Sequence, residues 1–166
     1  MIDGVAPPGI LPLEAAKDGE RALQRSLALC REEAACATAF PALQNHFDEL
    51  MTRYAVPQSI NIANPSTGES KPMLVSASSL QGALFSMLYS RETARLVPLT
   101  IERAWLGDLS ALAALGNAAD SINALMHFSV ICSEDIPLLD SAEVAAAAGT
   151  FMYDGLVQPR VEGCKV

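Results

Sequence analysis

The sequence predicts a mainly helical domain with one small β-hairpin, and three observations support this prediction. Alanine, the strongest helix former, occupies 27 of the 166 positions, whereas aromatic residues, which favour strands, make up 5%. Two short apolar runs flank an Asn-Pro and Gly turn over about residues 58–76, a pattern typical of a hairpin. Five residues recur at helical spacing on one face: Leu43, Phe47, Leu50, Met51 and Tyr54.

Two helices and a short connection are expected before the hairpin. The first dozen residues contain three prolines and two glycines, so we expect a loop there. Asp18 suits the N-cap of a first helix, and the run 30–36 continues as a short helix or turn. Pro41 suits the first position of the next helix, which Pro57 ends. The first helix would carry an apolar stripe of Leu23, Leu27 and Cys30.

Helices are expected to resume after the hairpin. Ser78 and Gln81, three residues apart, form a capping box at the start of a helix. Pro98 opens a further helix, and Gly107 with Asp108 ends it and caps the next. The apolar residues expected to face inward are Leu80, Leu84, Met87, Leu88, Ile101, Ala104, Trp105, Leu109, Leu112, Leu115, Ala118, Ile122, Leu125 and Met126.

The C-terminal part of the chain gives weaker signals. The apolar segment Phe128–Cys132 is too short to assign to a helix or a strand. Asp140 suits the N-cap of a last alanine-rich helix that runs through Ala148. The ending, Gly155–Val166, is expected to be irregular. No internal repeat or low-complexity linker is found, which favours one domain of ordinary size.

The charge balance excludes two classes of partner. The net charge is −8 and the isoelectric point is near 4.6, whereas a protein that neutralises phosphates normally has a basic face. We therefore expect no nucleic-acid partner and no binding to an anionic membrane. No apolar run approaches the roughly 18 residues of a transmembrane helix. The N-terminus has neither a basic start nor an apolar stretch, so no signal peptide is expected.

The four cysteines leave several possibilities open. They could be reduced core residues, metal ligands or two disulfide bridges. A metal site is not expected, because there is no CxxC pair and because Cys132 and Cys164 lie far from each other. Cys30 and Cys36, six residues apart, could form a bridge only where the helix breaks between them, since the Cα atoms must lie within about 7 Å.

Motifs of catalysis and of cofactor binding are absent from the sequence. There is no Gly-x-Ser-x-Gly elbow for a serine nucleophile, and neither of the two glycine-rich phosphate-binding patterns occurs. No cofactor is expected. His46 lies at the border of an apolar helix face, so we expect no chemistry from it. His127 follows Met126, and a structural hydrogen bond is expected there rather than catalysis.

An acidic pair, Glu134 and Asp135, follows the apolar segment and precedes Pro137. From residue type alone, the pair would be a solvated loop or an N-cap. The functional alternative is that one carboxylate points into a pocket and pairs with a cation.

Several short motifs occur in an order that resembles one known family. The motifs are Asp3-Gly4-Val5-Ala6-Pro7-Pro8, Cys30-x5-Cys36 followed by Phe40-Pro41, Asn64-Pro65-Ser66-Thr67-Gly68-Glu69, Leu88-Tyr89, Leu96-Val97-Pro98-Leu99, Gly107-Asp108 and Val130-Ile131-Cys132-Ser133-Glu134-Asp135. Together they span nearly the whole chain. Their order resembles the cap segment of tripeptidyl-aminopeptidase-like α/β-hydrolases, which are relatives of the prolyl aminopeptidases.

The resemblance implies roles for six residues. It implies the disulfides Cys30–Cys36 and Cys132–Cys164 in an exported protein. In related aminopeptidases, acidic cap residues hold the free α-ammonium group of a peptide substrate. The resemblance makes Glu134 the first candidate for this role and Asp135 the second.

The resemblance also implies a domain organisation and a function. Residues 1–12 would be the end of a hydrolase core strand with a linker, residues 13–150 a helical cap, and residues 151–166 a segment that returns towards the core. The catalytic elbow would precede this segment, and the acid and base would follow it. We therefore expect a substrate-gating cap of a secreted or periplasmic serine hydrolase, inactive alone. Its partners would be the catalytic core and a short peptide with a free N-terminus.

Two alternatives remain open at this stage. One is a stand-alone helical binding or interaction module without enzymatic activity. The other is a cytosolic helical domain with reduced cysteines. A cap without its core should expose an apolar underside larger than a few hundred Å² and self-associate through it, whereas a stand-alone module should not.

Overall fold

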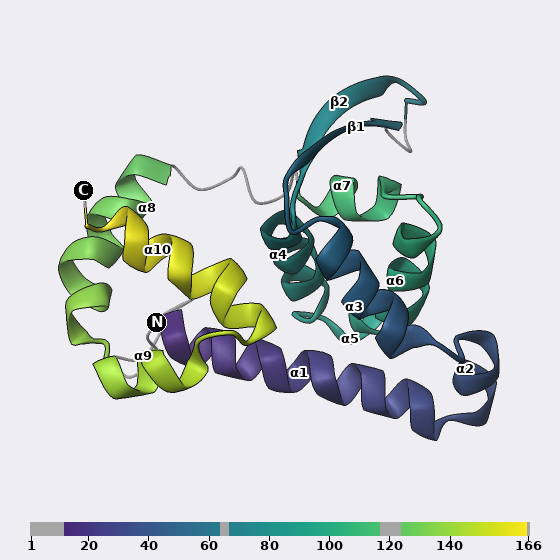
Figure 1. Ribbon diagram of the computed structural model, residues 1–166, viewed down its shortest axis with the longest axis horizontal. Coiled ribbons are helices and arrows are strands. Elements are labelled where there is room, and N and C mark those ends of the chain that lie inside the picture. Colours follow the sequence, from purple (N-terminus) through teal and green to yellow (C-terminus); the bar gives the residue numbers. More distant parts are fainter. Residues whose placement is uncertain (1–11, 64–66, 117–123, 166) are drawn as a thin grey trace, which may run out of the picture. The chain divides into compact units, whose positions relative to one another are not determined.

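The computed structural model describes residues 12–63, 67–116 and 124–165 (Figure 1). It is mainly helical with one two-stranded antiparallel hairpin, which confirms the fold class predicted from the sequence. The chain divides into two compact units, Arg21–Ser121 and the combination of Met1–Glu20 with Ile122–Val166. The loop expected over the first residues and the inward positions Ala118 and Ile122 lie outside the described residues.

The first helix, α1 (Pro12–Glu32), begins six residues before Asp18, so the expected N-cap at Asp18 is wrong. Proline is well suited to the first helical position, because its fixed φ matches the helix and its missing N–H would have no partner there. The apolar stripe also begins earlier than expected, since Leu13 and Ala16 are buried. The expected stripe residues Leu23, Leu27 and Cys30 are buried too.

A break between α1 and α2 (Ala34–Ala39) brings two cysteines together. Glu33 has an extended backbone, with φ −91° and ψ 119°, and its carboxylate accepts hydrogen bonds from the N–H groups of Ala35 and Cys36 at 3.2 and 2.6 Å. This N-cap redirects the chain. The Cα atoms of Cys30 and Cys36 then lie 5.0 Å apart and the residues form a disulfide, at the helix break that the sequence requires for it.

The helices of unit Arg21–Ser121 bury most of the apolar residues expected to face inward, but Met51, Leu88 and Trp105 are only half-buried, and the side chain of Leu115 lies outside the described part of the structure. Its further helices are α3 (Leu43–Arg53), α4 (Ala77–Met87), α5 (Arg91–Ala94), α6 (Val97–Trp105) and α7 (Ser110–Gly116). The buried side chains include Leu43, Phe47, Leu50, Tyr54, Leu80, Leu84, Met87, Ile101, Ala104, Leu109 and Leu112. Helix α3 packs against α6, and α4 packs against α7.

The starts of two of these helices differ from expectation. Helix α3 begins at Leu43, because Pro41 lies in a preceding turn. The capping box of α4 consists of Ser76 and Ser79 rather than Ser78 and Gln81. Both side chains of this box are serine hydroxyls, whereas the usual capping box has Glu or Gln at the third helical position.

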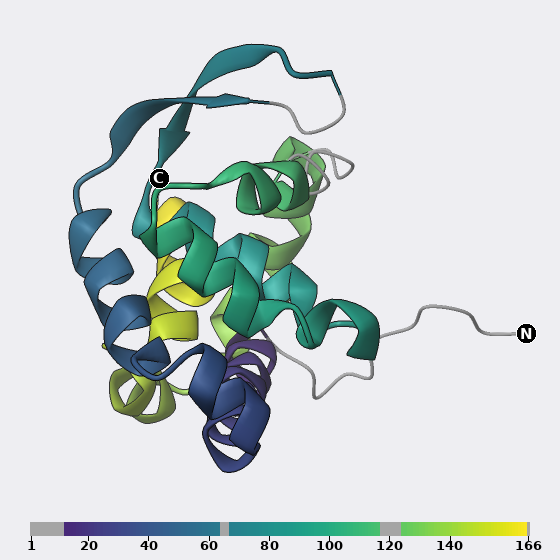
Figure 2. The same cartoon turned by 90° about the vertical axis from the view of Figure 1, so that its right-hand side faces the viewer.

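The hairpin consists of β1 (Gln58–Ala63) and β2 (Ser70–Val75); it projects beyond the ends of α3 and α4, and β1 contacts α7 (Figures 1 and 2). Its register pairs Ile60 with Met73, both half-buried, whereas Leu74, paired with Ser59 on the other face, is exposed. A hydrogen bond of 2.8 Å from the N–H of Ala77 to the carbonyl of Tyr54 joins the end of α3 to the start of α4. The hairpin is therefore an insertion between α3 and α4, whose adjacent ends are joined directly by this hydrogen bond.

The other unit contains, after the start of α1, a series of short helical segments. These are α8 (Ala124–Val130), the π-helical turn η2 (Ile131–Asp135), the 3-10 turn η3 (Ile136–Leu138), α9 (Ser141–Ala147), the π-helical turn η4 (Tyr153–Val157) and α10 (Gln158–Gly163). Asp140 caps α9 as predicted. The expectation of an irregular ending is wrong, because π-helical and helical turns continue to Gly163.

The core of this unit is small and consists of Leu13, Ala16, Ile131, Ala147, Met152, Tyr153 and Val157. Leu125 and Met126, expected to face inward, are 85% and 57% exposed. Gly163 approaches α8 closely, since a Cβ there would lie 2.8 Å from the Phe128 ring. A disulfide joins Cys132 in η2 to Cys164 just after α10. Packing and a covalent link thus hold the same two segments together.

The two disulfides indicate an oxidising, extracellular type of compartment. No helix among the described residues combines the length and apolar character needed to cross a membrane.

The two disulfides should contribute unequally to stability. The sequence separations are 32 residues for Cys132–Cys164 and 6 for Cys30–Cys36. In the chain-entropy model, replacing both cysteines by serine lowers the free energy of unfolding by about 3–4 kcal/mol for the longer loop and about 2 kcal/mol for the shorter one. Urea unfolding of the two double variants measures this. An equal or greater loss for the 30–36 pair contradicts the prediction.

The turn between α6 and α7 should make stability depend on pH. Hydrogen bonds from the Ser110 hydroxyl (2.6 Å) and N–H (3.1 Å) lower the pKa of the Asp108 carboxyl below 3.8, and Arg103 adds to this. A lowered native pKa stabilises the fold above the unfolded pKa, and this contribution is lost as the pH falls through the native pKa.

We therefore expect Asp108→Ala to lower the free energy of unfolding by a constant amount above about pH 5 and by a shrinking amount below about pH 4. Urea unfolding of wild type and variant at a series of pH values gives this difference. Ser110→Ala removes the main cause of the shift and should weaken the pH dependence. A difference that persists unchanged at the acid end would show that the carboxylate charge is not responsible.

Candidate functional site

Glu134 and Asp135 lie together on the π-helical turn η2. The Glu134 side chain is exposed and the Asp135 side chain is half-buried. Within the part of the chain that the structure describes, neither carboxylate makes a hydrogen bond or an ion pair. Neither residue caps a helix through its side chain, although Asp135 directly precedes η3. Such π-helical turns occur often at functional sites, because the extra residue redirects side chains.

The backbone that carries this acidic pair is fixed from both sides. Cys132, two residues before Glu134, is bonded to Cys164, and Ile131 is buried. The Ser133 hydroxyl donates hydrogen bonds to the carbonyls of Ser129 and Val130 at 2.8 and 3.1 Å, which ties η2 to α8. The disulfide and these hydrogen bonds therefore hold the backbone around Glu134, and its exposed carboxylate is accessible to a cation.

Large apolar side chains are exposed in the same segment as the acidic pair. They are Leu125, Met126 and Val130 on α8 and Leu138 on η3. Exposed apolar side chains were expected for a cap without its core. We call these four residues the exposed apolar segment.

His46 takes part in a polar network that sequence reasoning did not identify. Its Nδ1 atom lies 2.7 Å from Glu102 Oε2, and its ring stacks on Trp105 at a centroid distance of 3.7 Å. Trp105 Nε1 donates a hydrogen bond of 2.7 Å to Glu49, and Arg53 donates one of 2.8 Å to the Trp105 carbonyl. The network joins α3 to α6 beside their apolar contact.

The network has no catalytic geometry in the described residues, because no Ser, Thr or Cys side chain hydrogen-bonds to His46 there. Its sequence signal is the spacing on each helix, since His46, Glu49 and Arg53 repeat at helical intervals, as do Glu102 and Trp105. His127 lies on α8 and makes an edge-on ring contact with Phe128, with centroids 6.3 Å apart. The hydrogen bond expected for His127 is not found among the described residues.

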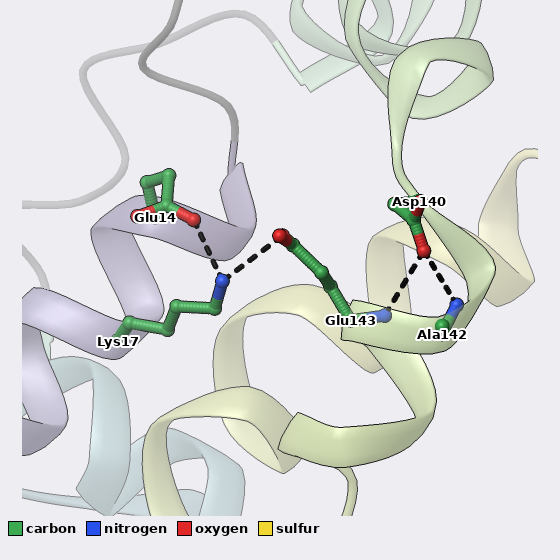
Figure 3. A network of polar contacts seen from close by, with 5 residues as sticks. All are labelled: Glu14, Lys17, Asp140, Ala142 and Glu143. Carbon is green, nitrogen blue, oxygen red and sulfur yellow. Dashed lines mark hydrogen bonds and ion pairs between the residues drawn. The ribbon is translucent and has the colours of Figure 1, made fainter.

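Lys17 links α1 to α9 within the unit Met1–Glu20 and Ile122–Val166 (Figure 3). Its Nζ atom lies 2.7 Å from Glu14 and 3.0 Å from Glu143. Both hydrogen bonds raise the pKa of Lys17, and the bond to Glu14 has the larger effect. Asp140 caps the same end of α9. The acidic side chains here are engaged with Lys17 and with backbone N–H groups, and the described residues contain no cluster that could hold a metal ion.

Unit Arg21–Ser121 contains an open groove of about 500 Å³. One wall is the α1 face with Ala22, Ser26 and Leu29, and the facing wall comes from the segment 88–98. Glu33 and the Cys30–Cys36 disulfide line it as well. Three arginines complete the lining: Arg25, Arg91 and Arg95. We call this the arginine groove. Sequence reasoning missed it because its walls come from two distant segments without a recognisable motif.

The structure thus pairs the cysteines as the resemblance implies and places Glu134 and Asp135 on one turn. His46 and His127 lie in different units. Comparison with family models, with curated proteins and with solved structures finds no match to this chain.

Proposed function

We propose that this chain is the substrate-gating cap of a secreted or periplasmic serine hydrolase of the aminopeptidase type. The observation that carries the proposal is the Glu134 carboxylate, which is exposed, lacks a partner among the described residues and lies two residues from the Cys132–Cys164 disulfide. That bridge is also one of the two that the family resemblance implies.

A fixed carboxylate of this kind would bind the α-ammonium group of a short peptide. With a nucleophile at a set distance, it would select the length between the amino terminus and the scissile bond. Its contribution is positioning rather than bond chemistry. Asp135 is the second candidate, because it lies on the same turn but is half-buried.

The exposed apolar segment supports a contact with a catalytic core. Leu125, Met126, Val130 and Leu138 would be covered by that core and would otherwise favour self-association. A cap that closes over the site also excludes water from the reaction. The chain has no Gly-x-Ser-x-Gly motif, so we expect no hydrolysis by the isolated chain.

The gene sequence on both sides of this segment tests the proposal directly. We expect a Gly-x-Ser-x-Gly motif upstream, where the motif order places the nucleophile, and an aspartate and a histidine downstream. Stop and start signals that directly flank the 166 residues would contradict the cap function and favour a binding module.

The role of Glu134 is tested by Glu134→Gln in the intact hydrolase. Loss of a charge-assisted hydrogen bond should lower kcat/KM for free-amino peptides by roughly 10- to 100-fold. For N-acetylated peptides kcat/KM should change little, because they carry no ammonium group. Steady-state kinetics on matched substrate pairs measures both effects.

The matched control is Glu92→Gln, which removes an exposed carboxylate from α5 in the other unit. It should leave both substrates unaffected. Equal losses on free and acetylated peptides after Glu134→Gln would rule out the anchor role, and Asp135→Asn then tests the second candidate.

A second candidate function is a stand-alone helical binding module without enzymatic activity. The arginine groove favours it, because an open groove of about 500 Å³ falls within the size range of small-molecule sites. Flanking gene sequence separates the two functions.

A further inference from the structure

We propose that the arginine groove binds a small amphiphilic anion, with an anionic head such as a carboxylate and an unbranched apolar tail. The proposal does not depend on the cap function, because it concerns residues of unit Arg21–Ser121 only.

The charge of the groove is opposite to that of the protein. The chain has 11 basic and 19 acidic residues, yet three of its arginines line this one groove. The lining includes one carboxylate, that of Glu33, and it is engaged as the N-cap of α2 with two backbone N–H groups. A ligand in the groove therefore meets positive charge.

The arginines are available to a ligand. Arg91 and Arg95 are exposed, and neither makes an ion pair or a hydrogen bond through its side chain within the described residues. Arg25 lies 3.4 Å from Glu32, and both side chains are about 60% exposed, at 62% and 59%. Solvent screens such an exposed pair, so it competes weakly with a bound anion.

The positions of Arg91 and Arg95 suit a single anionic group. They are four residues apart on α5 and its C-cap, so they lie on the same side of one helical turn. Guanidinium groups donate paired hydrogen bonds to carboxylate, phosphate or sulfate oxygens. Two guanidiniums one turn apart would hold one such head from two sides.

The remaining surface of the groove is apolar and suits the aliphatic tail of a ligand. Leu29 is 48% exposed there, and the remaining apolar lining residues are Ala22, Leu88, Ala94 and Pro98. An inorganic anion would leave the exposed part of this apolar surface, above all Leu29, in water, whereas an aliphatic chain would cover it and gain the free energy of apolar burial. The groove therefore suits an amphiphile better than a free ion.

The test is calorimetric titration of the full chain with sodium decanoate below its critical micelle concentration. Acetate supplies the same head without the tail, and decyltrimethylammonium supplies the same tail with the opposite charge. Decyl phosphate distinguishes a carboxylate head from a phosphate head. We expect one saturable decanoate or decyl phosphate site per chain, with much weaker binding of acetate and of the cation.

Substitutions then locate the site. Arg91→Gln combined with Arg95→Gln should weaken binding of the anion at least about tenfold, because charge-assisted hydrogen bonds are lost. Neither side chain holds the fold together through described contacts, so the variant should keep its circular dichroism spectrum. Leu29→Ser should weaken binding of decanoate but not change the weak binding of acetate.

The matched control is Arg31→Gln, which removes an exposed arginine of α1 that does not line the groove. It should bind decanoate as the wild type does. The proposal is overturned by absence of saturable binding, by equal binding of decyltrimethylammonium, or by an equal loss of affinity in Arg31→Gln.

Discussion

The Cys132–Cys164 disulfide is the constraint on which the unit with the acidic pair depends. Its described helices after α1 have at most seven residues, which is too short to be stable on helix propensity alone. Its core is small, so the burial of apolar surface alone contributes little stability. The bridge joins η2 to the residue after α10, and the close approach of Gly163 to Phe128 packs α10 against α8. The disulfide and the packing of Gly163 against Phe128 together hold the turn that carries Glu134 in place.

The unit Arg21–Ser121 is stabilised in a different way. Its helices bury continuous apolar faces, and the contact of α3 with α6 is reinforced by stacking of His46 on Trp105 and by hydrogen bonds to Glu49 and Glu102. The Glu33 N-cap redirects the chain after α1, and the Cys30–Cys36 disulfide closes this short turn rather than a core. Because α1 keeps its outer face free of that core, Leu29 and Arg25 remain at the surface as part of a groove wall.

Sequence patterns predicted the features that are encoded locally. The helical face of α3, the hairpin and the Asp140 cap each depend on residues close in sequence. The errors came where tertiary contacts or neighbouring residues decide the outcome. Leu13 and Ala16 extend α1 back past Asp18, and Leu125 and Met126 are exposed although their type favours burial. The residues of the acidic pair could be selected from the sequence through a resemblance, but the arginine groove could not, because no local pattern joins residues 22–36 to residues 88–98.

The two candidate sites suit ligands of opposite charge. Glu134 presents a carboxylate and suits an ammonium group, whereas Arg91 and Arg95 present guanidiniums and suit an anion. They belong to different units, and the described polar contacts of each site lie within its own unit. The two sites share no described contact, and substitutions that share no partner usually act independently. Changes in peptide selection after substitution at Glu134 can therefore be separated from changes in anion binding at the groove, even in one protein.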